Sequence, residues 1–195
     1  PLLGLQILPS LFVSLGLGFV FSRLSIEKTI WNIRILDLIV AAAIWMLAAG
    51  LWLAEPQQQS FNAPRPSPPT YEFYPFSDST SYDLGSQFAL IGQGLNNNLL
   101  TDKPLYMLFL TILHLVGGQS VRIVISLQVL VLAIFPVMLF LIGREIHSRG
   151  AGILVALLAI FKERNAIAAV LDIQVSHAKL MMTEVPIALL ISVSV

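Results

Sequence analysis

Long apolar runs alternate with short polar segments along most of this chain. Residues 2–21, 35–54 and 121–143 each contain at most one charged side chain, and each is long enough to cross about 30 Å of hydrocarbon as an α-helix. A further run occupies residues 185–195. Pro136 inside the third run predicts a kink. The pattern therefore predicts an all-α, polytopic transmembrane helical bundle.

The run that begins at residue 151 allows two interpretations. It is apolar through Phe161, and Lys162, Glu163 and Arg164 then interrupt it. Either a short span ends at these charges, or residues 151–171 form one span with charges inside the membrane. The first is less costly, because each unpaired charge at the bilayer centre costs at least about 2.5 kcal/mol.

Residues 55–120 differ from the rest of the chain. The six prolines within residues 55–75 predict an extended loop. Residues 82–95 place apolar side chains at helical spacing, which predicts a short amphipathic helix ended by Asn96–Asn98. Residues 105–116 are apolar but too short for a full span, which favours an interfacial or re-entrant helix.

The composition supports lipid as the solvent for much of the surface. Only 11% of the residues are charged, against about 25% in soluble domains. The formal net charge of +0 argues against a nucleic-acid partner, which requires a basic surplus. The chain has no cysteine, so it has neither disulfides nor a thiolate metal site. Because it begins at Pro1 and ends within an apolar run, we expect a piece of a longer protein.

The distribution of basic residues predicts the topology. Short segments rich in lysine and arginine stay cytoplasmic, and residues 22–34 and 144–149 are of this kind. Residues 55–120 are poor in basic residues for their length, so we expect them outside the cytoplasm. If the run from residue 151 crosses the membrane, residues 162–184 emerge on the same outer face, although Lys162 and Arg164 depart from the rule there. The expected location is a plasma or inner membrane, with the active face extracytoplasmic.

The expected outer face collects a set of ionisable side chains. A carboxylate at a low-dielectric rim suits a general base, because burial raises its pKa towards the working pH. Lysine and arginine at such a rim can hold a lipid-linked phosphate. The candidates are Asp78, Asp83, Asp102, Lys103, Arg122, His177, Lys179 and Glu184.

Several of these residue types also have ordinary structural roles. Asp78 suits a helix cap, and Asp83 suits the first turn of a helix, where acids complement the dipole. Lys103 and Arg122 suit interfacial positions, from which long basic side chains reach water. His114 is predicted to be structural. For His177 the two roles are equally open.

The order of these motifs resembles a known family. The chain reads Asp78-x-x-x-Tyr82, then Asp102-Lys103-Pro104-Leu105-Tyr106, and later Thr183-Glu184-Val185-Pro186. This order resembles the amino-terminal part of the GT-C glycosyltransferases, in particular the group of protein mannosyltransferases and lipid A aminoarabinose transferases. The resemblance covers about residues 35–195, and it implies that residues 1–195 form the amino-terminal part of one transmembrane domain.

The resemblance implies a glycosyltransferase that moves a sugar from a polyprenyl-phosphate donor to a glycan, lipid or protein acceptor outside the cytoplasm. Asp78 matches the acidic residue that activates the acceptor or helps to hold a metal, and Lys103 matches the residue that holds the donor phosphate. Glu184 matches a further acidic position. Residues near these that are expected to contact the substrate or its phosphate are Tyr82, Asp83, Arg122, His177 and Lys179.

The resemblance leaves the use of a divalent metal ion open, with Asp78 and Glu184 as its candidate ligands. The family often carries a second acid directly after the first, and here that position is Ser79, which argues against a metal. Two other classes of function stay open on sequence grounds. One is a transporter or flippase, and the other is a membrane subunit without catalytic activity.

Overall fold

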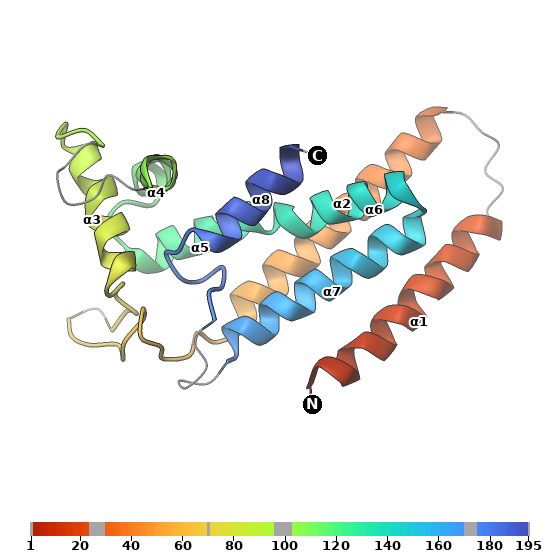
Figure 1. The fold of residues 1–195 in the computed structure, drawn as a ribbon, viewed down its shortest axis with the longest axis horizontal. Coiled ribbons are helices and arrows are strands. Elements are labelled where there is room, and N and C mark those ends of the chain that lie inside the picture. Colours follow the sequence, from red (N-terminus) through yellow and green to blue (C-terminus); the bar gives the residue numbers. More distant parts are fainter. Residues whose placement is uncertain (1, 24–29, 70, 96–102, 170–174, 195) are drawn as a thin grey trace. The chain divides into compact units, whose positions relative to one another are not determined.

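The computed structural model describes residues 2–23, 30–69, 71–95, 103–169 and 175–194. Within these ranges every regular element is a helix, which confirms the all-α class (Figure 1). The helices are α1 Leu2–Arg23, α2 Ile30–Ala54, α3 Asp78–Leu90, α4 Pro104–Gly117, α5 Val121–Leu132, α6 Ile134–Ile146, α7 Arg149–Ile167 and α8 Glu184–Ser194.

Two helical stretches are long and apolar enough to cross a membrane. They are Ile35–Ala54 and Val121–Ile146, and both lie where the sequence predicts spans. The second is interrupted at Ala133, between α5 and α6. This break lies three residues before Pro136, as expected for a residue that clashes with the preceding turn and offers no N–H to it. These two helices weakly support a membrane association, and the multi-pass arrangement stays a prediction.

The described helices differ from the predicted boundaries in three places. α2 begins at Ile30, five residues before the predicted span. α7 continues through Lys162–Arg164 to Ile167, so the helix does not end at the charges. Glu163 is buried there, and both Glu163 and Arg164 have interaction partners, which lets the helix carry them.

α3 begins four residues earlier than predicted and ends at Leu90 instead of residue 95. The chain after it turns at Gly92 and Gly94, whose φ angles are 85° and 74°, a conformation that commonly ends a helix. The predicted apolar face is also not the buried one. Leu84 and Ile91 are exposed. The buried side of α3 consists of Ser79, Tyr82, Asp83, Gly85 and Ser86.

Residues 55–69 and 71–77 form loop structure with two isolated bridges, Ser60–Ala63 and Ser67–Glu72, as the prolines predict. The predicted helix end at Asn96–Asn98 and the candidate Asp102 lie outside the described residues. α4 matches the predicted short apolar helix closely.

The chain divides into two compact units. Unit 1 consists of residues 1–54, 133–165 and 189–195, and unit 2 of residues 55–132 and 166–188.

In unit 1, α7 lies beside α1 and α2 (Figure 1). The Ser14 hydroxyl on α1 donates a hydrogen bond to the Gly150 carbonyl. On α2, the Trp52 indole N–H donates to the Ile160 carbonyl at 3.0 Å. Ser14 and Trp52 are both buried. Their hydrogen bonds therefore hold α7 against α1 and against α2.

Asp37 on α2 forms a buried charged contact in unit 1. Its side chain is only 8% exposed, and it accepts hydrogen bonds from Arg144 at 2.7 Å and from Arg149 at 2.6 Å. A buried carboxylate needs such partners, because an unpaired charge in a low-dielectric interior is strongly destabilising. The pair fixes α2 against the turn between α6 and α7.

The turn from α6 to α7 depends on two glycines in close contact. A Cβ added at Gly143 would lie 2.8 Å from the Gly152 Cα, and a Cβ added at Gly152 would overlap the carbonyl oxygen of Phe140. Two helix backbones therefore touch without intervening side chains, as in small-residue packing of membrane helices.

Gly152→Ala should therefore destabilise unit 1 by about 1–3 kcal/mol, because the added methyl overpacks a backbone contact. Gly50→Ala in α2 is the matched control, since no atom lies within 4 Å of its added Cβ. The measurement is the free energy of unfolding in mixed detergent micelles. Equal stability of the two variants would contradict the close approach.

Candidate functional site

Unit 2 contains every described candidate that the sequence singled out. The first group, in residues 55–132, is Asp78, Tyr82, Asp83, Lys103 and Arg122, and the second, in residues 166–188, is His177, Lys179 and Glu184. The two polar segments that the topology argument assigned to one face of a membrane thus fold into one compact unit. The face itself stays a prediction.

A hydrogen-bonded framework joins the two segments. The Tyr106 hydroxyl on α4 donates to the Gln128 side-chain oxygen at 2.9 Å. The Gln128 amide on α5 donates to the carbonyls of Ala178 and Leu180, each at 2.8 Å. Gln128 is completely buried, so these bonds satisfy an amide that water cannot reach.

Tyr82 is part of the same framework. Its ring packs edge-on against Tyr106 with the centroids 5.5 Å apart, and it is buried in an apolar cluster with Met107 and Leu110. Burial raises the pKa of Tyr106, and the charges of Asp83 and Glu184 add to that shift. Tyr106 therefore stays protonated as a donor, and the ring of Tyr82 has a packing role.

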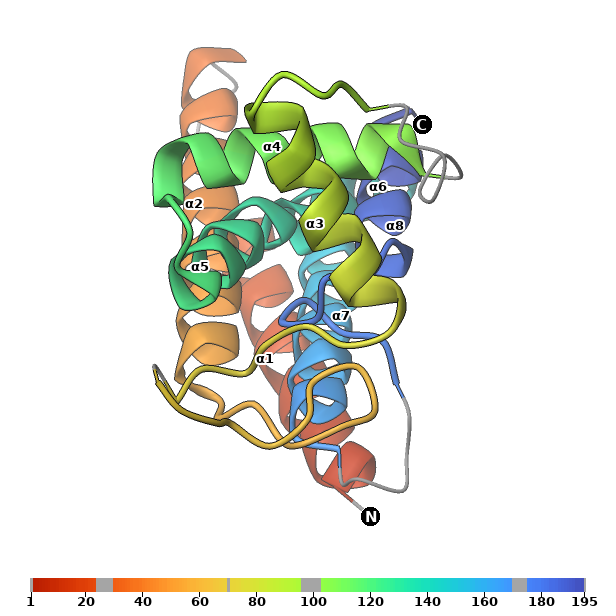
Figure 2. The ribbon, with the colours of Figure 1, turned by 90° about the vertical axis from the view of Figure 1, so that its left-hand side faces the viewer.

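Asp83 on α3 and His114 on α4 form a buried pair, and the two helices lie against each other (Figure 2). The His114 Nε2 lies 2.8 Å from the Asp83 carboxylate, and the other carboxylate oxygen accepts a hydrogen bond from Gln87 at 2.9 Å. Asp83 lies in the second turn of α3, so the predicted first-turn position is wrong. His114 has the structural role that the sequence predicted, and its partner is a candidate site residue.

Asp78 and Lys103 each stand at the start of a helix. Asp78 is the first residue of α3, after Ser77 in the N-cap position, so the predicted capping role does not apply. Its exposed carboxylate is in the first turn, where a negative charge complements the helix dipole. Lys103 precedes Pro104 as the N-cap of α4, and its carbonyl accepts the N–H groups of Tyr106 and Met107. Its half-buried ammonium is not used in that cap.

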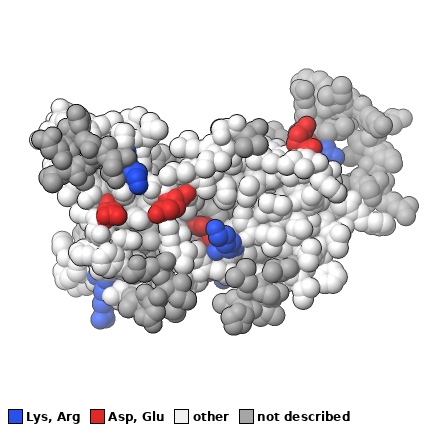
Figure 3. Space-filling view, in the orientation of Figure 1, with Lys and Arg blue, Asp and Glu red and all other residues white. Residues whose placement is uncertain are grey.

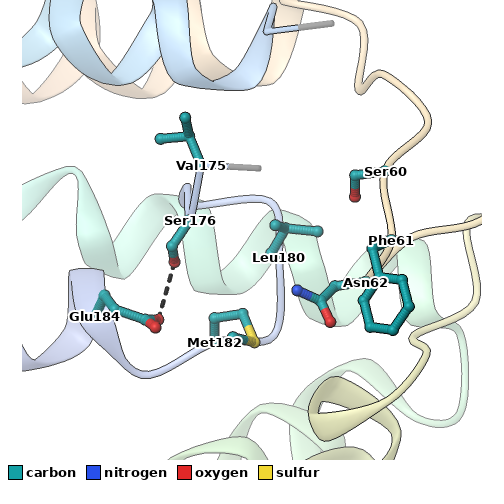
Figure 4. Close-up of a pocket in the computed structure, with 8 residues that line it drawn as sticks. All are labelled: Ser60, Phe61, Asn62, Val175, Ser176, Leu180, Met182 and Glu184. Atoms are coloured by element: carbon teal, nitrogen blue, oxygen red, sulfur yellow. Dashed lines mark hydrogen bonds between the residues drawn. The ribbon is translucent and has the colours of Figure 1, made fainter. Parts of the chain in front are cut away.

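A cavity of about 190 Å³ lies between the loop of residues 55–77 and the segment that leads into α8 (Figure 4). Glu184 at the start of α8 accepts a hydrogen bond from Ser176 at 2.9 Å. The Ser60 hydroxyl is buried and has no hydrogen-bond partner among the described residues. The lining combines these polar groups with apolar ones and consists of Ser60, Phe61, Asn62, Val175, Ser176, Leu180, Met182 and Glu184.

The cavity can accept a small ligand that presents both hydroxyl groups and an apolar face. Glu184 has carboxylate lone pairs beyond the one that Ser176 occupies. Ser60 supplies a donor that lacks a partner, and unsatisfied buried groups are favourable positions for a ligand contact. Only Glu184 among the predicted site residues lines it. Sequence reasoning missed Ser60 and Asn62, because isolated polar residues in a proline-rich loop carry no distinctive signal.

His177 and Lys179 use their polar atoms within the unit. The His177 Nδ1 accepts the backbone N–H of Lys179 at 3.2 Å, and burial, with the charge of Lys179, lowers the pKa of His177 to about 4. His177 is therefore neutral at pH 7. The Lys179 ammonium donates to the Glu55 carbonyl. Burial lowers the pKa of Lys179, and the charge of Glu55 opposes that shift.

Arg122 is the cation of the predicted set that faces outward, at the second position of α5. Among the described residues, no group of three or more histidine, aspartate or glutamate side chains is arranged to hold a metal ion. The described surroundings of Asp78 and Glu184 therefore do not fit a metal centre.

Comparison with known proteins gave no match. No family model, no curated protein and no solved structure is similar to this chain.

His177→Gln should reduce the acid sensitivity of the fold. The pKa of His177 is about 4 in the folded chain and about 6.5 in an unfolded one, so the unfolded chain binds this proton first as the pH falls. The contribution is fully present above about pH 6.5 and is lost towards pH 4, by up to about 3 kcal/mol.

The measurement is the free energy of unfolding at pH 7 and at pH 4.5. The difference between the two should be smaller in His177→Gln than in the wild type. His147→Gln, at an exposed histidine after α6, should leave the difference unchanged. An equal loss in all three proteins would contradict a buried, neutral His177.

Proposed function

We propose that this chain is part of a membrane glycosyltransferase that transfers a sugar from a polyprenyl-phosphate donor to an acceptor outside the cytoplasm. The observation that carries the proposal is the gathering of the candidate acids and bases of two distant segments in unit 2. The order of motifs from Asp78 to Pro186 resembles that of the GT-C glycosyltransferases. This resemblance is the reason for proposing sugar transfer as the activity of these residues.

Several observations support a polytopic membrane protein. Only 28% of the first candidate span and 39% of the second are buried within the chain, so most of their apolar side chains need another apolar environment. Figure 3 shows charged side chains as a few small patches on a largely uncharged face. Lipid covers such a surface without an unfavourable exposure of apolar area.

α4 fits an interfacial position in this arrangement. One side is buried in unit 2 through Met107 and Leu110, and the opposite side exposes Leu105, Leu115 and Val116 by 73%, 71% and 74%. A helix that is apolar on both sides needs lipid on the side that the protein leaves uncovered. The part of unit 2 around α4 would then lie at the membrane surface, where a lipid-linked substrate and a soluble acceptor meet.

The proposed reaction is a displacement at the anomeric carbon. Asp78 takes the proton of the acceptor hydroxyl, and the acceptor oxygen forms the new bond to that carbon. The bond between the carbon and the phosphate oxygen breaks, and its electron pair leaves with the polyprenyl phosphate. Lys103 and Arg122 stabilise this phosphate by charge-assisted hydrogen bonds. The cavity beside Glu184 suits a single sugar ring, being smaller than the roughly 300–1,000 Å³ typical of larger ligands.

Asp78→Asn in the full-length protein should lower the rate of sugar transfer by about 10²–10⁴-fold, because the amide cannot accept the acceptor's proton. The assay measures transfer from a polyprenyl-phosphate sugar in reconstituted vesicles. Glu145→Gln, at an exposed acid in the last turn of α6, is the matched control and should retain the wild-type rate. An unchanged rate in Asp78→Asn would exclude this residue as the base, and movement of the intact lipid without transfer would indicate a flippase.

The proposed topology is testable with single cysteines, since the chain has none of its own. Gln59→Cys, in the exposed part of the loop before α3, should react with a membrane-impermeant maleimide in intact cells. Ser148→Cys, in the basic turn between α6 and α7, should react only after permeabilisation, because such turns stay cytoplasmic. Labelling of both cysteines in intact cells would contradict the arrangement.

A further inference from the structure

The pair of Asp83 and His114 is unusual in its burial and in its bonding. Asp83 is 6% exposed and His114 is 3% exposed, and the pair joins the middle of α3 to the last turn of α4. Around it, the Thr111 hydroxyl donates to the Ser86 carbonyl at 3.3 Å. The contact between α3 and α4 therefore combines this pair and the small polar side chains beside it with the apolar packing of Tyr82 against α4.

Both ring nitrogens of His114 face an oxygen that can only accept a hydrogen bond. Nε2 lies 2.8 Å from the Asp83 carboxylate, and Nδ1 lies 2.8 Å from the Gly118 carbonyl. A neutral imidazole carries one N–H, whereas the imidazolium carries two. Only the protonated ring satisfies both contacts. The neutral ring would place a nitrogen lone pair against an oxygen lone pair at one of them.

The Gly118 carbonyl is held in place by the end of α4. Gly118 has a φ of 66°, and its N–H donates to the His114 carbonyl at 2.8 Å. This left-handed turn brings the chain back over the histidine ring. The second acceptor is thus part of the helix cap and does not depend on a mobile side chain.

We propose that the Asp83–His114 pair is a pH-dependent lock between α3 and α4, closed while His114 carries its proton and opened when the proton is lost.

Among the described residues around His114, Asp83 is the charged group that shifts its pKa. Tyr106 stays protonated, because burial and the nearby charge of Asp83 raise its pKa, and the ring of Tyr82 packs against it. His177 and Lys179, in the segment packed on α5, use their polar atoms on backbone groups. The other charged residues of this unit that the sequence singled out lie at its surface. Asp78, Arg122 and Glu184 are exposed, and Lys103 is half-buried.

The direction of the pH dependence follows from the opposing effects on the pKa of His114. Burial lowers the pKa of His114, but the hydrogen bonds to Asp83 and Gly118 and the charge of Asp83 outweigh burial, so the pKa is raised. The stabilisation is fully present below about pH 6.5, the value for a free histidine. It is lost as the pH rises through the raised pKa, so the lock opens on the alkaline side.

One consequence rests on the proposed function. Asp78 is the first residue of α3, so a lock on α3 also holds the proposed base in place. His114 would be a positioning residue, and its deprotonation would lower transfer without any contact to the substrate.

The lock can be tested by cysteine accessibility without any turnover. Ser86 on α3 is 0% exposed, whereas Leu84 on the same helix is 43% exposed. Ser86→Cys should react with a maleimide only when α3 opens from α4, and Leu84→Cys reports the intrinsic reactivity of an exposed thiol. The ratio of the two rates should rise with pH between 6 and 9, by about tenfold for each unit by which the closed-state pKa of His114 exceeds the open-state value.

Two backgrounds identify the titrating group. In His114→Gln the ratio should not depend on pH, because the amide does not titrate in this range. In His177→Gln the rise should persist, since that histidine is already neutral above about pH 4. A wild-type ratio that is constant from pH 6 to 9, or a rise that persists in His114→Gln, would overturn the lock.

If His114→Gln does not fold, Asp83→Asn can be used instead to test whether the pair causes the pH dependence. Loss of the carboxylate charge should move the rise to lower pH, and an unmoved midpoint would overturn the proposal. The transfer assay is a separate experiment, which tests the positioning role of His114. Transfer that falls over the pH range of opening supports the positioning role, whereas opening without any measurable transfer at any pH would count against the proposed function and leave the lock intact.

Discussion

The organisation of unit 2 depends on the requirement that a buried amide be fully hydrogen-bonded. Gln128 has no exposed surface, and it accepts from Tyr106 while donating to the carbonyls of Ala178 and Leu180. Leaving such a group unpaired costs about 1–3 kcal/mol for each lost partner. The segment that carries His177, Lys179 and Glu184 is therefore held against α5, and through Tyr106 against α4. A side chain in the middle of an apolar helix thus determines which distant polar residues share a unit.

The same requirement assigns opposite protonation states to two histidines of this unit. His114 faces two acceptors, the Asp83 carboxylate and the Gly118 carbonyl, so it needs two protons. His177 accepts a backbone N–H at Nδ1, so it needs a lone pair there. Burial alone disfavours the charged form of both rings. The neighbouring groups decide the outcome, with the pKa of His114 raised and that of His177 lowered to about 4.

The apolar periodicity of the sequence was sufficient to predict most helices, including the break near Pro136 and the short helix of residues 105–116. It was insufficient wherever the deciding contact is distant along the chain. His114 carries no local sign of its partner 31 positions earlier, and Gln128 reads as an ordinary residue of a membrane span. The carboxyl-terminal boundary of α3 was wrong because the chain turns at Gly92 and Gly94, before its apolar pattern ends. The charges of Lys162–Arg164 favoured a short span that ends there, yet α7 continues through them to Ile167.

A buried ion pair such as Asp83–His114 adds little net free energy to the contact between two helices. Desolvation of both charges offsets most of their attraction, and apolar side chains of similar volume would often be at least as stabilising. An ion pair differs from an apolar contact in one respect that matters here, because its strength changes with the protonation of one partner. α4 also exposes a wholly apolar side, through Leu105, Leu115 and Val116. If lipid covers that side, little water remains to screen the pair, and the contrast between its protonated and deprotonated states becomes larger.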